Sequence, residues 1–126
     1  MVRGVGIDIV EIGRIKRLIE TYGDVFLNKV FTAGEIDYCT GMARPEVHFS
    51  GRWAVKEAFY KALPARLQSR ATWKCIEILP DPGSGKPGIS FVSDDFKTGC
   101  VGTGITTFHL SITHERTFCT AVVVME

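Results

Sequence analysis

The sequence lacks long apolar runs. None approaches the ~20 residues that span a bilayer, and the opening MVRGVGIDIVEIGR, interrupted by Asp8 and Glu11, has no apolar region typical of a signal peptide. Internal repeats and low-complexity segments are also missing. We therefore expect a cytoplasmic protein with no membrane partner, folded as one domain over residues 1–126, because this length suffices to bury a core.

An excess of charge of either sign is lacking as well. The 15 Lys and Arg residues nearly balance 14 Asp and Glu residues, and the formal net charge is +1. No global field therefore draws the protein to nucleic acid, and any anion must be bound by local cations. C-x-x-C pairs are absent, and no His stands at metal-ligand spacing from a cysteine. This argues against a thiolate zinc site and is typical of buried thiols in a reducing compartment; the four cysteines are Cys39, Cys75, Cys100 and Cys119.

The N-terminal part of the chain shows the periodicity of a strand and then that of a helix. β-branched residues dominate VRGVGIDIVEI, residues 2–12, which predicts a strand. Apolar residues then recur at spacings of three and four, which predicts an amphipathic helix over 12–22. A carboxylate, Asp8, lies near the junction and points to the opposite side of the strand from three apolar residues, Val5, Ile7 and Ile9.

Two further helices are predicted before residue 64. Thr32 followed by Glu35 has the spacing of a capping box, so Glu35 is either that cap or a functional carboxylate. The next helix runs from about Pro45 to Leu63 and stops at Pro64. Its buried face is expected to consist of two apolar stripes, formed by Ala54, Ala58, Ala62, Val55, Phe59 and Leu63. The rest of this helix is expected to be free; that side carries Trp53, Glu57, Tyr60 and Lys61, with Arg52 and Lys56 beside them.

The C-terminal half favours strands. WKCIEIL, residues 73–79, and ISFVS, residues 89–93, flank a turn-rich segment and predict paired strands. A short helix, weakened by glycines, is predicted within 93–104. The segments 106–113 and 116–125 predict an antiparallel hairpin with HE at its turn. Because helices and strands are mixed in this order, the fold class is α+β.

The charged side of the 45–63 helix predicts a phosphate site. A carboxylate that can bind a hard cation, placed beside Lys and Arg donors, suits a polyphosphate, since Mg²⁺ typically takes one or two carboxylates plus phosphate oxygens. On the residues alone, Glu57 and Lys61 could equally form a surface ion pair, and Asp8 could be a solvated edge residue, a helix cap or a metal ligand. His114, between two strands, is either a solvated turn residue or a functional group.

Several separated motifs resemble those of the holo-acyl-carrier-protein synthases, the short form of the 4′-phosphopantetheinyl transferases. These motifs are GVGIDIVEIGRI near the N-terminus, FT-x-x-E at 31–35, GRWAVKEAFYKAL at 51–63, GKP at 85–87 and LSITHE at 110–115. They follow the family's order over nearly the whole chain. The resemblance implies the 4′-phosphopantetheinyl transferase fold, in which an antiparallel sheet wraps around or packs on a long central helix. The Gly-rich segment 97–104 departs from the family's usual Ala-rich helix.

The resemblance implies transfer of the phosphopantetheine arm of coenzyme A to a serine hydroxyl of an apo acyl carrier protein, with release of adenosine 3′,5′-bisphosphate. By that resemblance Asp8 and Glu57 would bind Mg²⁺, and oxygen ligands suit Mn²⁺ as well. Lys61 and Lys56 would stabilise charge on the departing phosphate, and either Glu57 or a water on the metal would take the serine proton. Further contacts to the coenzyme are expected from Arg52 and His114.

The resemblance and the charge pattern also predict partners. Carrier proteins of this kind are acidic, so the basic residues of the 12–22 helix could dock one, or could form an ordinary solvated face; these residues are Arg14, Lys16 and Arg17. Family members of this length imply a homotrimer with active sites shared between subunits. Two other functions use the same residues: a metal-dependent nucleotide pyrophosphohydrolase, and a coenzyme-A-binding subunit without turnover.

Overall fold

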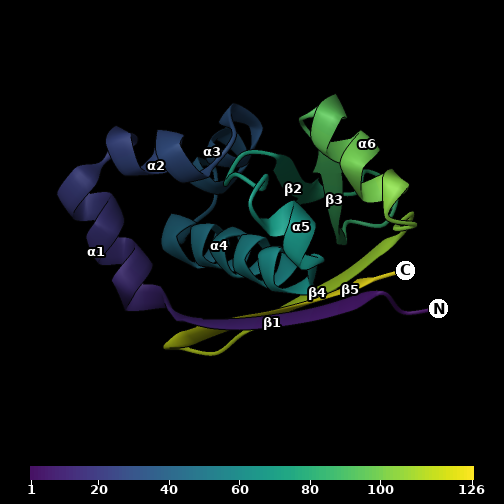
Figure 1. Cartoon of the computed structure of the whole chain (residues 1–126). Coiled ribbons are helices and arrows are strands. Elements are labelled where there is room, and N and C mark those ends of the chain that lie inside the picture. The colour runs from purple at the N-terminus through teal and green to yellow at the C-terminus, as the bar shows by residue number, and fades with distance from the viewer.

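The computed structural model describes all 126 residues and has the α+β organisation predicted from the sequence (Figure 1). In chain order the elements are β1 (Gly4–Glu11), α1 (Ile12–Tyr22), α2 (Asp24–Val30), α3 (Ala33–Thr40), α4 (Pro45–Ala62), α5 (Ala65–Gln68), β2 (Ile76–Pro80), β3 (Pro87–Phe91), α6 (Asp94–Gly102), β4 (Phe108–His114) and β5 (Phe118–Met125). β5 lies between β1 and β4 in one antiparallel sheet, and β2 pairs with β3 in a second. Figure 1 shows α4 at the centre, lying along the larger sheet.

Strand β1 packs directly on α4, and two glycines make this approach possible. A Cβ atom built on Gly6 would lie 1.8 Å from the carbonyl oxygen of Ala58, and one on Gly4 would lie 2.0 Å from that of Ala62. Only glycine fits at such a distance from another backbone. Because Asp8 lies two residues after Gly6 on the same side of the strand, this packing carries Asp8 toward the charged side of α4.

The other side of β1 is apolar and exposed. Val5, Ile7 and Ile9 alternate with Gly6 and Asp8 as the sequence predicts, yet these three residues are 59%, 61% and 64% exposed. They continue onto β5, where Val5 pairs with Val124 and Ile7 with Val122. The larger sheet therefore has one face on α4 and one apolar face without a partner in this chain.

Helix α4 confirms the predicted start, stop and apolar stripes. Pro45 occupies its first turn, it ends before Pro64, and the six residues of the two stripes are all buried. The expectation that the remaining side is free is wrong for Arg52 and Lys56, which are only 5% and 4% exposed. These two side chains extend toward β2, where backbone carbonyl oxygens accept their hydrogen bonds.

The structure also defines the start of β2, the helix α6 and the apolar character of the helices. The strand expected over 73–79 begins only at Ile76, because residues 73–75 form a turn in which the Cys75 N–H donates to the Thr72 carbonyl. Helix α6 forms despite its glycines, since the Ser93 side chain caps it and Phe96 anchors it in the core. No helix has both the length and the apolar character required to cross a bilayer.

Candidate active site

The structure brings Asp8 and Lys61 into direct contact, although 53 residues separate them in sequence. The Lys61 ammonium lies 3.1 Å from Oδ1 of Asp8 and donates to the Ile7 carbonyl at 3.0 Å. Its side chain remains 50% exposed, so it can also reach a ligand. The pair links β1 to the C-terminal half of α4.

Glu57 lies one turn before Lys61 on α4 and faces the same site. Burial raises the pKa of the Glu57 carboxyl above its ordinary value, and the negative charge of Asp8 adds to the increase, while Lys61 and Arg14 oppose it. Glu57 itself makes no ion pair. Two carboxylates that repel each other beside a half-exposed ammonium form a site suited to an additional cation and an anion.

The donor set fits a hard divalent cation that arrives with its substrate. No group of three or more His, Cys, Asp and Glu side chains is arranged to hold a metal, so the protein offers no complete cage. Mg²⁺ commonly uses one or two carboxylates and completes its octahedron with phosphate oxygens and water. Asp8 and Glu57 match that requirement. The roles of Asp8 and Glu57 as metal ligands stay predictions.

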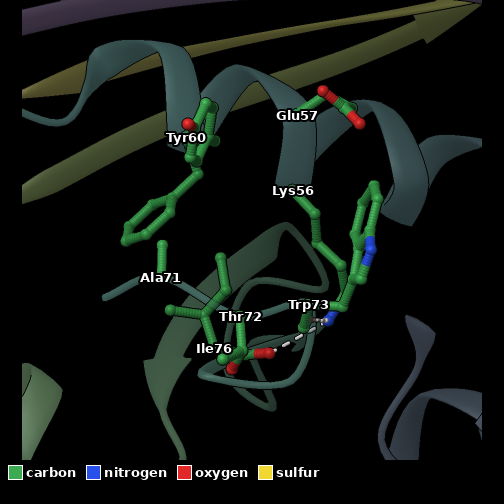
Figure 2. A pocket seen from close by; sticks show the side chains of 8 residues that line it. Lys56, Glu57, Tyr60, Ala71, Thr72, Trp73 and Ile76 are labelled. Atoms are coloured by element: carbon green, nitrogen blue, oxygen red, sulfur yellow. Dashed lines mark hydrogen bonds between the residues drawn. The ribbon is translucent and has the colours of Figure 1, made fainter. Parts of the chain in front are cut away.

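A cavity of about 280 Å³ opens beside Glu57 (Figure 2). Glu57 and Tyr60 project from α4 at its edge, and Lys56 extends from the same helix toward the opposite wall. That wall comes from the segment before and at the start of β2 and consists of Ala71, Thr72, Trp73 and Ile76, with Phe59 completing the lining. A largely apolar cavity beside charged groups suits a ligand with a polar head and a less polar arm.

The ammonium group of Lys56 makes three contacts with other groups of the protein. Its ammonium forms a buried ion pair with Glu35 at 3.0 Å and donates to the carbonyls of Trp73 and Ile76. Glu35 completes the predicted capping box with Thr32, and its second carboxylate oxygen accepts the Ile78 N–H at 2.9 Å. Glu35 is therefore both the cap and a buried charge partner, whereas the sequence offered the cap and a functional carboxylate as alternatives.

A second, smaller cavity of about 180 Å³ is lined in part by Arg52. Arg52 stacks over Tyr38 at 4.5 Å and donates to the Ile78 carbonyl. His48 lines the same cavity, and its pKa is lowered by burial and by the positive charges of Arg52 and His114. His114 is exposed at the end of β4. These groups form an electropositive region suited to a phosphate.

The predicted docking residues lie on the exposed side of α1. Arg14 stacks over the ring of Trp53 at 5.6 Å and acts electrostatically on Glu57, so it borders the site itself. Arg17 pairs with Glu11 at 3.4 Å on the surface, and Lys16 is exposed without an ion pair. The basic surface of α1 is thus continuous with the mouth of the site.

Known proteins are similar to this chain over nearly its whole length. The family model described as 4′-phosphopantetheinyl transferase superfamily matches residues 4–119. The holo-[acyl-carrier-protein] synthase of Halothermothrix orenii is 40% identical over 126 residues, 100% of this chain and 98% of that protein. That of Syntrophus aciditrophicus is 37% identical over 126 residues, again 100% of this chain, and 97% of that protein.

Solved structures show the same fold. Holo-[acyl-carrier-protein] synthase from Neisseria meningitidis superposes with a TM-score of 0.86 at 28% identity, over 100% of this chain and 99% of that one. The Helicobacter pylori synthase, in complex with coenzyme A, superposes with a TM-score of 0.79 at 27% identity, over 97% and 99%. This chain therefore belongs to the 4′-phosphopantetheinyl transferase superfamily and, within it, to the holo-[acyl-carrier-protein] synthases.

Proposed function

We propose that this protein transfers the 4′-phosphopantetheine arm of coenzyme A to a serine hydroxyl of an apo acyl carrier protein and releases adenosine 3′,5′-bisphosphate. The observation that carries the proposal is the meeting of Asp8, Glu57 and Lys61 beside the larger cavity. The full-length relatives bear the name of this activity, and the Helicobacter pylori structure contains coenzyme A.

Asp8 and Glu57 are the proposed Mg²⁺ ligands, with Mn²⁺ as an alternative metal. When bound, the metal would neutralise charge on the pyrophosphate. The donor set supports this assignment, because both groups are carboxylates and Glu57 has no ion-pair partner of its own.

The protein's own groups supply the remaining chemistry. The departing phosphate gains negative charge as the pyrophosphate bond breaks, and the half-exposed Lys61 ammonium is the group proposed to stabilise that charge. Either Glu57 or a water held on the metal is the proposed acceptor of the serine proton. Asp8 holds Lys61 in place through their 3.1 Å contact.

The adenosine end of the coenzyme is assigned to the electropositive region around the smaller cavity. Arg52 lines this cavity with a buried guanidinium, which presents donors in a fixed plane that matches a phosphate. His114 contributes positive charge to the same region when protonated. His48, which the sequence interpretation missed, lines the same cavity.

We also propose that the protein is a homotrimer with shared active sites, as its family resemblance implies. The apolar face of the larger sheet supports assembly, because Val5, Ile7 and Ile9 of β1 are exposed and pair with residues of β5 that include the half-buried Val124 and Val122. Val5→Lys is expected to yield monomers in analytical ultracentrifugation. The matched control is Val101→Lys on α6, which changes a similarly exposed valine, 53% against 59%, and is expected to leave the assembly intact. A Val5→Lys protein that assembles like the wild type would refute this assignment.

An acyl carrier protein is the proposed macromolecular partner, with α1 as its docking surface. The exposed Lys16 and the neighbouring Arg14 and Arg17 give this surface positive charge next to the site mouth. A cytoplasmic setting is proposed as well; the four cysteines are free and buried, which suits a reducing compartment.

Intact mass spectrometry of an apo carrier protein, incubated with this protein, coenzyme A and Mg²⁺, tests the function. The expected result is a gain of one phosphopantetheine group that is lost with Glu57→Gln. Release of adenosine bisphosphate without any gain in carrier mass would instead identify a pyrophosphohydrolase. If neither product forms with several carriers, the protein is a binding subunit and the transferase assignment is wrong.

A further inference from the structure

The ammonium group of Lys56 has no hydrogen left for a ligand. A lysine ammonium carries three donors, and here it meets three acceptors: Glu35 Oε1 at 3.0 Å, the Ile76 carbonyl at 3.1 Å and the Trp73 carbonyl. Its side chain is 2% exposed and that of Glu35 is fully buried. Lys61 contrasts with it, since that side chain is half exposed and reaches solvent at the site.

The acceptors of Lys56 belong to the wall of the larger cavity. Trp73 and Ile76 both line this cavity, and Thr72, between Ala71 and Trp73, lies on the same wall (Figure 2). Glu35 connects the arrangement to the fold at two more points, because it accepts the N–H of Thr32 on one oxygen and that of Ile78 on the other. The ion pair thus ties α3, α4 and β2 to the segment 71–76.

We propose that Glu35 and Lys56 are positioning residues, which fix the segment 71–76 as the cavity wall opposite Glu57. On this basis Lys56 affects the binding of the coenzyme by holding the segment 71–76 in position, and it does not itself bind a phosphate. A phosphate could recruit Lys56 only by displacing Glu35 and two carbonyls, which would leave a buried carboxylate without its cation. The inference rests on the proposed function, because the cavity is taken to receive part of the coenzyme.

Two double variants separate positioning from direct charge stabilisation. Glu35→Gln with Lys56→Gln removes both charges but keeps, on a side chain one atom shorter, an amide with two N–H donors directed at the Trp73 and Ile76 carbonyls that Lys56 binds. Glu35→Gln with Lys56→Met has the same residue at 35 and no donor at 56. Both avoid an unpaired buried charge.

Positioning predicts that the Gln variant keeps kcat within about tenfold of the wild type, while the Met variant loses a further tenfold or more and has a raised KM for coenzyme A. Both must show wild-type circular dichroism for the comparison. Equal, severe losses in two folded variants would overturn the proposal and make Lys56 a direct charge stabiliser. A wild-type protein that modifies no carrier would instead refute the proposed function.

A measurement on the wild-type protein decides the matter if the variants do not fold. In a protein with ¹⁵N-labelled lysines, the Nζ resonances of Lys56 and Lys61 are followed while coenzyme A and Mg²⁺ are added. The Lys61 resonance is expected to shift, and that of Lys56 is expected to stay in place and to remain protected from hydrogen exchange. A Lys56 shift as large as that of Lys61 would show that it leaves its partners for the phosphate, and the proposal would be wrong.

Discussion

Replacement of Gly6 by alanine should damage the site without touching any charged group. The new Cβ would lie 1.8 Å from the Ala58 carbonyl oxygen, whereas ordinary contact begins at 3.4 Å, so β1 or α4 must move by about 1.6 Å. The obstacle is backbone, which cannot rotate away as a side chain would. Overpacking of this kind costs about 1–3 kcal/mol or more of unfolding free energy.

The same displacement should reach the chemistry through Asp8, which lies two residues further along β1 on the same side. A misplacement of about 1 Å can lower a rate about 10²-fold, so Gly6→Ala is expected to lose at least that much transfer activity. Urea unfolding measures the loss of unfolding free energy, and carrier modification followed by intact mass measures the loss of transfer activity.

Two controls accompany Gly6→Ala. Gly102→Ala should be neutral or slightly stabilising, because nothing lies within 4 Å of the position that its new Cβ would take. A second change, Ala58→Gly, should not rescue Gly6→Ala, since the clash is with the carbonyl and not with the Ala58 side chain. Wild-type stability and activity in Gly6→Ala would contradict the account of how β1 positions Asp8.

Three further predictions concern charged groups. Lys61→Met should lower kcat about 10²- to 10³-fold in the carrier-modification assay, with Lys61→Arg retaining part of the rate; equal kcat in Lys61→Met would exclude Lys61 from charge stabilisation. His48 has a pKa lowered from 6.5 by burial and neighbouring positive charge, so its protonation destabilises the folded state. The wild type should therefore lose more unfolding free energy than His48→Asn when the pH falls from about 7.5 to about 5.5; equal losses in urea titrations would contradict this sign. Lys16→Glu with Arg17→Glu should raise the KM for the carrier about tenfold at low salt and leave the KM for coenzyme A unchanged, whereas Lys97→Glu should change neither.

Local chemistry makes much of the fold predictable. The capping box at Thr32 and Glu35, the prolines that bound α4 and the alternation in the C-terminal hairpin each depend on residues close together in sequence. These signals locate the elements to within a few residues. The start of β2 differs from the prediction because residues 73–75 form a turn, and the Trp73 carbonyl accepts a hydrogen bond from Lys56 and not from a neighbouring strand.

Long-range pairing is not predictable from the same patterns. A helical wheel shows which residues of α4 are apolar, but it does not show that Glu35 and the β2 carbonyls lie on the side of Lys56 and Arg52 and can satisfy buried cations. His48 stands four residues before Arg52 within the predicted helix, so the same helical wheel places it on the side of Arg52.

The proximity of Asp8 and Glu57 depends on a contact between β1 and α4 that no local pattern encodes. Besides the family motifs, the signal in the sequence is the pair Gly4 and Gly6 facing Ala62 and Ala58, small residues that permit close backbone approach. Alternation in β1 likewise could not indicate which side would be covered. The glycine side faces the helix, and the apolar side is left for another surface.

Metal binding by Asp8 and Glu57 is the central claim, and Mn²⁺ binding followed by electron paramagnetic resonance in the presence of coenzyme A tests it most directly. The wild-type protein is expected to bind Mn²⁺ only when the coenzyme is present, because two carboxylates alone leave the coordination incomplete. Asp8→Asn and Glu57→Gln, each shown to be folded, are expected to lose this coenzyme-dependent binding. If both variants bind Mn²⁺ as tightly as the wild type, the metal lies elsewhere and the proposed role of the carboxylate pair is wrong.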